Sequence, residues 1–207
     1  MTRSFLPIHP IMAQSFAVID QEMGQHTFSP AEYAIARRVI HTTADFEFKS
    51  LLRFSPGAIA TAVTALQTGV PIVTDVGMVR QGIANQVAQT FQNPVISAIE
   101  HATVADPGQT RTETGLLRCL EQYPEAIYAI GNAPTALLAL CRWSETAIAR
   151  PRLVIGVPVG FIAVVESKQA LANTDLPQIR VEGRKGGSTV AAAIVNALLQ
   201  LAWEAAD

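Results

Sequence analysis

Short apolar runs alternate with longer helical patterns along most of this chain, and that alternation constrains the fold more than any other feature. Five runs have the length and composition of strands that are covered on both faces. They are Pro71–Val76, Pro94–Ile99, Ala126–Ile130, Leu153–Val157 and Gln178–Val181. Strands that alternate with helices are typical of a parallel, doubly wound sheet. We therefore predict an α/β fold, one domain over residues 1–207, with a mainly parallel five-stranded sheet and helices on both faces.

Segments with helical spacing follow or precede these strands. They are Gly57–Gly69, Gln109–Tyr123, Pro134–Ala147, Phe161–Ala172 and Gly187–Glu204. Two further helices are expected before the sheet. One runs from Pro10 to Met23, and the other begins at Ser29 and Pro30, an N-cap followed by proline at the first helical position. The second helix is predicted to end near residues 41–43. The sequence of residues 45–54 is compatible with either an irregular strand or a loop.

The balance of charge excludes two classes of protein. Charged residues make up 15% of the chain, hydrophobic residues make up 49%, and the net charge is −2. A chain this apolar is not disordered, and it lacks the basic excess of a nucleic-acid-binding domain. The charged fraction of an average soluble domain is about 25%. The deficit indicates that a second copy covers part of the surface, so we expect a homodimer.

No segment has the pattern of a membrane-spanning helix, and the cysteines do not have the pattern of a disulfide framework. The uncharged stretch Phe54–Thr74 is interrupted by proline and glycine, which favours a helix followed by a buried strand. The segment Met1–Pro10 lacks the apolar core of a signal peptide. Cys119 and Cys141 lie in apolar helical stretches and are predicted to be buried free thiols. We therefore expect a cytoplasmic protein without membrane contact.

Four strand ends are rich in small residues. In an open parallel sheet, ligands bind at the carboxyl ends of the strands. Three of these ends lead into helices, whose free N–H groups attract anions, and Arg184 and Lys185 add positive charge beside one of them. Any single turn is more often a tight connection than a binding site, but several together favour an anionic ligand. We expect the pocket at residues 75–78, 132–135, 158–160 and 186–188.

The common catalytic motifs are missing from the sequence. It contains no G-x-G-x-x-G, Walker or G-x-S-x-G motif, and its histidines and cysteines lack the spacing of metal ligands. We therefore expect no metal and no cofactor. Among the histidines, His41 is the best suited to proton exchange, because hydroxyl neighbours such as Thr42 can fix its tautomer. A structural histidine at a helix C-terminus remains the alternative from spacing alone.

Several segments together resemble the precorrin-8X methylmutase family, over nearly the whole chain. The most specific are Ala129–Leu137, with the sequence AIGNAPTAL, and Gly156–Phe161, with the sequence GVPVGF. The others are Gln14–Ile19, Val39–Thr42, Phe54–Pro56, Pro71–Asp75, Met78–Val79, Glu166–Lys168 and Gly186–Ser188. The resemblance implies a homodimeric α/β enzyme late in the construction of the corrin ring. Such an enzyme moves a methyl group from C-11 to C-12 of a corrinoid precursor, without an external donor, and holds its product tightly.

The resemblance also implies roles for individual residues. The catalytic histidine of the family falls on His41, where it is expected to protonate a ring nitrogen. A substrate-contacting serine falls on Ser15, and an arginine that meets a substrate carboxylate falls on Arg111. The residues after the histidine depart from the family, which often has Ala-Cys where this chain has Thr42 and Thr43. The small-residue turns add further candidates for substrate binding, namely Asn132, Thr135, Gly160, Gly187 and Ser188.

Two other functions remain open at this point. A non-catalytic carrier of a corrin would use the same pocket without needing His41. An α/β enzyme of another class would use the turn Gly183–Thr189 for a phosphorylated substrate, although a complete phosphate-loop motif is absent. Whether the substrate contains cobalt or is metal-free also remains open.

Overall fold

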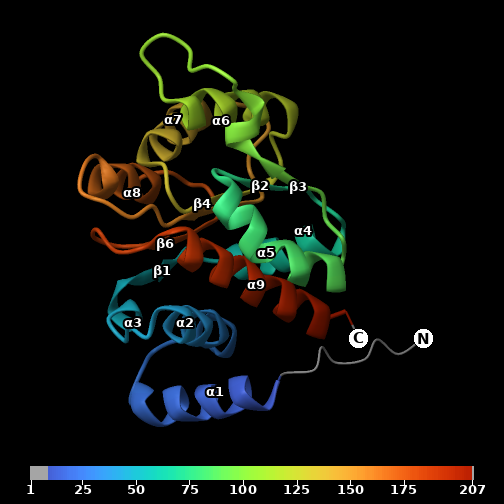
Figure 1. The fold of residues 1–207 in the computed structure, drawn as a ribbon, viewed down its shortest axis with the longest axis vertical. Helices are drawn as coiled ribbons and strands as arrows, with labels where there is room; N and C mark the ends of the chain where they lie inside the picture. The colour runs from blue at the N-terminus through green and yellow to red at the C-terminus, as the bar shows by residue number, and fades with distance from the viewer. Residues whose placement is uncertain (1–8, 207) are drawn as a thin grey trace.

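A computed structural model describes residues 9–206 of the chain. One six-stranded sheet, in the order β1-β6-β5-β4-β2-β3, has helices on both faces (Figure 1). The strands are β1 (Leu52–Phe54), β2 (Ile72–Thr74), β3 (Val95–Ser97), β4 (Ile127–Ile130), β5 (Leu153–Gly156) and β6 (Gln178–Val181). The helices are α1 (Pro10–Met23), α2 (Pro30–Thr43), α3 (Phe48–Leu51), α4 (Ala58–Gln67), α5 (Gly77–Gln89), the 3₁₀ helix η1 (Ala98–His101), α6 (Arg111–Gln122), α7 (Pro134–Ser144), α8 (Val164–Ala172) and α9 (Ser188–Glu204).

The five predicted strands are confirmed, but the predicted number of strands was wrong by one. The sixth strand, β1, pairs antiparallel with β6 at the edge of the sheet, with Leu52 opposite Val181. It lies within residues 45–54, whose sequence is compatible with either an irregular strand or a loop. Three residues that follow directly on the single turn of α3 are too few to show the period of two that marks a strand.

The remaining five strands are parallel, and their order reverses between β2 and β4. Right-handed crossovers then place α5 on one face of the sheet and α6, α7 and α8 on the other. Alternate residues of β4 belong to the two apolar cores: Ile127 packs on the side of α9, and Tyr128 packs on the side of α6 and α7. The fold is therefore the doubly wound α/β architecture that the sequence predicted.

The N-terminal helices form an additional layer outside α9. In Figure 1, α9 lies between α2 and α5, and α1 lies on the far side of α2. The start of α2 is fixed by a capping box, in which the Ser29 hydroxyl accepts the Glu32 N–H and the Glu32 carboxylate accepts the Ser29 N–H. Helix α2 packs against α9, and its last turn, which carries His41, lines the same cavity as the first half of α9.

Close backbone packing sets the position of the first turn of α9. A Cβ atom on Gly131, after β4, would lie 2.8 Å from the Cα atom of Ser188. Gly186 has a φ of +150°, and a Cβ there would lie 2.2 Å from the Val157 carbonyl oxygen. Only glycine permits such contacts, so α9 begins directly against the ends of β4 and β5.

Most helix predictions are confirmed, whereas α5 was not predicted. Its buried residues Val79, Ile83 and Val87 recur every four positions, but polar and small residues fill the rest, and its amphipathic pattern is weak. The uncharged stretch before residue 75 forms α4 and β2, as expected. Within residues 9–206, no helix combines the length and apolar character that crossing a membrane requires. Cys119 and Cys141 are buried and free, again as expected.

Candidate active site

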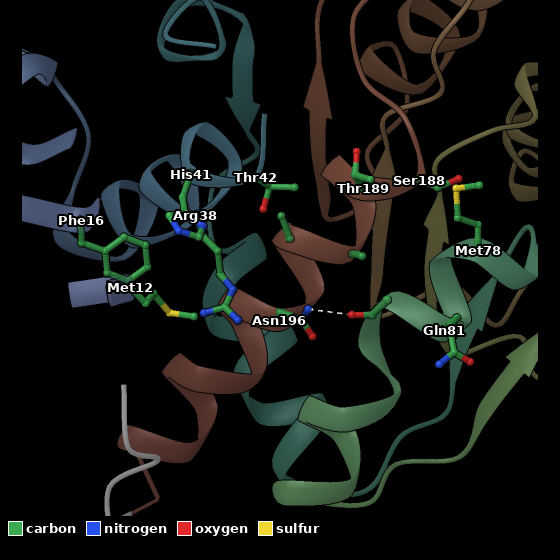
Figure 2. A pocket seen from close by; sticks show the side chains of 13 residues that line it. Met12, Phe16, Arg38, His41, Thr42, Met78, Gln81, Ser188, Thr189 and Asn196 are labelled. Atoms are coloured by element: carbon green, nitrogen blue, oxygen red, sulfur yellow. Dashed lines mark hydrogen bonds between the residues drawn. The ribbon is translucent and has the colours of Figure 1, made fainter. Parts of the chain in front are cut away.

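A cavity of about 690 Å³ lies between α1, α2, α5 and α9 (Figure 2). Both lining residues of α1 are apolar, and the polar lining groups come from α2, α5 and α9. The lining residues are Met12, Phe16, Arg38, His41, Thr42, Met78, Gln81, Gly82, Ser188, Thr189, Ala192, Ala193 and Asn196. Among residues 9–206, no aspartate or glutamate lines the cavity, and the ionisable lining groups are one guanidinium and one imidazole.

His41 lies in the last turn of α2 and is exposed at the cavity wall. Its ring packs edge-on against Phe16, with ring centroids 5.3 Å apart. The Thr43 hydroxyl donates to the Val39 carbonyl at 2.9 Å, so this neighbour bonds its own helix. Thr42 is the hydroxyl neighbour that faces the cavity. The imidazole is therefore accessible to a molecule in the cavity, with an apolar ring on one side.

The first turn of α9 forms the opposite part of the cavity. Ser188 and Thr189 line it, and no side chain caps the N-terminus of the helix. Gly187, the residue before α9, is buried and donates its N–H to the Val157 carbonyl at 2.8 Å. Of the two predicted binding residues on this turn, Ser188 lines the cavity. Gly187 does not line it and instead bonds the turn to the end of β5.

Two lysines hold the turn that precedes α9. The Lys168 ammonium donates to the carbonyl oxygens of Gly183, at 2.9 Å, and of Lys185, at 2.6 Å. Burial lowers the pKa of Lys168 to about 8. The Lys185 ammonium in turn pairs with Asp45 and Glu47, just after α2. These contacts link the segment after α2, the helix that carries His41, to the turn before α9. The Lys185 charge is thereby paired within the protein, whereas a phosphate-binding turn would require it to be free for the ligand.

Thr135 and Thr110, the residue before Arg111, come together outside the cavity. Arg111 is exposed at the first position of α6, and the hydroxyls of Thr110 and Thr135 lie 2.9 Å apart. Asn132 is exposed nearby in the sequence, just before α7, but its N–H is donated to Asp75 at 2.6 Å. A ligand at this group would meet side chains rather than a free backbone N–H of Asn132.

Asp75 lies completely buried at the end of β2. Its Oδ2 atom accepts the N–H groups of Asn132, at 2.6 Å, and of Ala133, at 2.8 Å. Burial raises the pKa of this carboxyl, and the same two N–H groups act in the opposite direction. The carboxylate therefore holds the turn between β4 and α7 in place.

The other two predicted residues, Ser15 and Gly160, do not line the cavity. Ser15 is one residue before Phe16, and its hydroxyl donates to the Ile11 carbonyl at 3.0 Å. Gly160 follows β5 and donates its N–H to the Arg184 carbonyl at 3.3 Å. Of the four turns expected to form the pocket, only Met78 and Ser188 reach this cavity.

Sequence reasoning did not select Arg38, Gln81 or Asn196 as site residues. Arg38 lies three positions before His41, a spacing that places two side chains on one face of a helix, and that signal was available. Gln81 and Asn196 lie on helices whose contact depends on the tertiary fold. Within residues 9–206, no three His, Cys, Asp or Glu side chains are grouped as a metal centre requires.

Comparison with known proteins identifies the family. The model of the precorrin-8X methylmutase family matches residues 10–201. Cobalt-precorrin-8 methylmutase of Synechocystis is 59% identical, over 94% of this chain and 96% of the relative. Precorrin-8X methylmutase of a Sinorhizobium species is 36% identical, over 91% of this chain and 92% of the relative.

The fold agrees with that of a solved relative. A crystal structure of the precorrin-8X methyl mutase from Thermus thermophilus superposes with a TM-score of 0.86 at 42% identity, covering 95% of this chain and 99% of that one. Matches of this extent, in both sequence and fold, cover all four walls of the cavity. The chain therefore belongs to the precorrin-8X methylmutase family of isomerases, which act in cobalamin biosynthesis.

Proposed function

We propose that the chain moves a methyl group from C-11 to C-12 of a precorrin-8-type tetrapyrrole, giving hydrogenobyrinate or cobyrinate, with His41 as the proton donor. The observation that carries this proposal is the exposed imidazole at the wall of a mostly apolar cavity of about 690 Å³. A volume of this size suits a large ligand that is held by many apolar contacts and a few directed polar ones. Relatives named for the metal-free and the cobalt-containing substrate both match the chain, so the proposal covers both.

His41 has the chemistry that this step requires. An imidazole exchanges a proton near neutral pH, and a proton added to a ring nitrogen draws electrons from the conjugated system. The barrier to methyl migration is then lower. Substrate and product are isomers, so the proton taken up at nitrogen is balanced by one lost after migration. The methyl group never leaves the molecule, and the protein has to orient the ring rather than supply a methyl donor.

The predicted binding residues would serve as anchors at the periphery of the macrocycle. Ser188 lies inside the cavity beside the uncapped start of α9, where a carboxylate is favoured by the free N–H groups. Outside it, Arg111 follows Thr110, whose hydroxyl meets that of Thr135, and we assign Arg111 and Thr135 a second anchoring role. We assign the substrate-binding role to these residues together with Ser15, Asn132, Gly160 and Gly187.

A homodimer is part of the proposal. Met78, at the cavity, and Phe161 and Ile162, after β5, are between 67% and 84% exposed, which is unusual for such large apolar side chains. A second copy would cover them and enclose the substrate. We expect an interface above roughly 1,000 Å² with an apolar centre. Light scattering at micromolar concentration tests this, and a monomer would contradict it.

The deciding experiment is a single-protein assay. Purified protein is mixed with precorrin-8X, or with the cobalt form, and the absorption spectrum is followed while NMR locates the migrated methyl group. We expect stoichiometric product with the methyl group at C-12. Tight binding of the corrinoid without conversion would show a carrier, and binding of a nucleotide without any corrinoid would indicate an enzyme of another class.

A further inference from the structure

Most arginines in residues 9–206 form an ion pair with a carboxylate. They are Arg37, Arg53, Arg80, Arg118, Arg142, Arg150, Arg152 and Arg180. Among the described arginines, Arg38, Arg111 and Arg184 form none. Arg111 and Arg184 are exposed, so water can solvate their charges. Arg38 differs from both, because it is only partly exposed and lines the cavity that contains His41.

The neighbouring residue shows how this chain treats an arginine with a structural role. Arg37 pairs with Asp20 at 3.0 Å, and its guanidinium lies 4.4 Å from the centroid of the Phe16 ring. Arg38 leaves the helix in another direction. In Figure 2 its side chain extends from α2 into the cavity, toward Met12 and Asn196. Arg37 therefore makes its contacts within the protein, whereas the adjacent Arg38 faces the cavity.

The cavity offers Arg38 no anion of its own. No carboxylate of the described residues lines it, and Asn196, a neutral amide that lines the same cavity, donates its N–H to the Gly82 carbonyl at 3.0 Å. Burial lowers the pKa of Arg38, which reflects the loss of water around its charge. A partly buried charge without a partner destabilises a protein, and an anionic ligand that pairs with it would remove that cost.

We propose that Arg38 binds one side-chain carboxylate of the substrate inside the cavity and thereby sets the orientation of the macrocycle relative to His41. This inference rests on the proposed function, because it takes the ligand to be a corrinoid with several carboxylates. The planar guanidinium binds a carboxylate through two parallel hydrogen bonds, which fixes direction as well as position. Arg38 and His41 lie one turn apart on the same helix, so the bound carboxylate and the proton donor keep a fixed separation.

Binding of hydrogenobyrinate, followed by its absorption spectrum, tests the role of Arg38. We expect Arg38→Met to weaken binding by about 10- to 100-fold, since a charge-assisted contact is lost. The same variant should melt at a higher temperature than the wild type without ligand, because an unpaired charge has been removed. A lower melting temperature with unchanged affinity per folded molecule would overturn the proposal.

Two further variants complete the test. Arg38→Lys keeps the charge without the two-pronged geometry, so we expect intermediate affinity; wild-type affinity in this variant and in Arg38→Met would overturn the proposal. Arg37→Met removes the same charge one residue away, and we expect it to lower the melting temperature with a much smaller loss of affinity. An equal loss in Arg37→Met and Arg38→Met would show a general charge effect and contradict a specific contact.

The result also separates this proposal from the proposed function. If wild-type protein converts precorrin-8X while Arg38→Met binds hydrogenobyrinate normally, the role of Arg38 is wrong and the methylmutase activity stands. If wild-type protein binds no corrinoid, the proposed function fails and the role of Arg38 fails with it.

Discussion

The Asp75 carboxylate accepts the backbone N–H of Asn132, with 2.6 Å between Oδ2 and nitrogen, across the point where the strand order of the sheet reverses. Ligands of doubly wound sheets bind in the crevice outside such a point. Here Asp75 also accepts the N–H of Ala133, and the next residue, Pro134, has no N–H to offer. The protein's own carboxylate fills the anion position before α7. The cavity lies instead between α2 and α9.

Replacing Asp75 by alanine should destabilise the fold and expose an anion site. Loss of the acceptor leaves the N–H groups of Asn132 and Ala133 unpaired, which should lower the unfolding free energy by about 1–3 kcal/mol. Urea denaturation measures this loss. Sulfate should then stabilise Asp75→Ala more than wild type, because it can occupy the vacated position.

Two controls accompany the sulfate experiment. Asp75→Asn keeps an acceptor oxygen without the charge, so we expect a smaller loss of stability than with alanine. Sodium chloride at matched ionic strength corrects for general salt effects. Equal stabilisation of wild type and Asp75→Ala by sulfate would show that the carboxylate does not occupy an anion site.

Features that depend on neighbouring residues could be predicted from the sequence, whereas contacts between residues far apart in the chain could not. The parallel strands and most helices follow from local apolar spacing, and the start of α2 follows from Ser29 and Pro30. The carboxylate that caps the turn before α7 lies 57 positions earlier in the chain, so a local pattern cannot reveal it. Arg37 and Arg38 are adjacent and chemically identical. Only the packing of α1, which brings Asp20 to one of them, tells them apart.

Lys168 should make stability depend on pH in the alkaline range. Burial lowers its pKa to about 8 in the folded protein, whereas an unfolded lysine titrates near 10.4. Between these values the unfolded state binds more protons, so the contribution of Lys168 to the unfolding free energy rises as the pH rises from about 8 to about 10.4. Below pH 8 the buried ammonium is at its most unfavourable.

The measurement compares wild type with Lys168→Met by urea denaturation at pH 7.5 and at pH 9.5. Other groups that titrate in this range, such as Cys119 and Cys141, contribute to both proteins and cancel in the difference. We expect the unfolding free energy of wild type to increase relative to that of the variant at the higher pH. A difference that is constant with pH would mean that Lys168 has an ordinary pKa.

Arg111→Ala should weaken substrate binding more than it slows the chemical step. An arginine that holds a remote carboxylate contributes about equally to the ground state and the transition state. A charge-assisted contact contributes about 1.5–3 kcal/mol, so the dissociation constant should rise roughly 10- to 100-fold. The matched control is Arg118→Ala on the same helix, whose partner is Asp106 and whose loss should leave binding unchanged. Unchanged binding in Arg111→Ala would mean that its guanidinium faces solvent in the complex.

His41→Asn should nearly abolish the methyl shift while the fold and corrinoid binding persist. Asparagine retains a hydrogen-bonding group at the cavity wall, but it cannot deliver a proton at neutral pH. Loss of a positioned general acid lowers the rate by about 10²–10⁴-fold. Single-turnover conversion, followed by the corrin spectrum, gives the rate of the chemical step, and melting curves on the same samples give the folded fraction.

A second histidine provides the control for the His41 experiment. His26 is exposed, stacks on Tyr33 with ring centroids 4.6 Å apart, and does not line the cavity. His26→Asn should therefore convert substrate at the wild-type rate. If His41 has only a structural role, its replacement lowers the melting temperature while turnover per folded molecule stays the same. Conversion at the wild-type rate by His41→Asn would rule out the acid role and leave His41 as a residue that shapes the cavity.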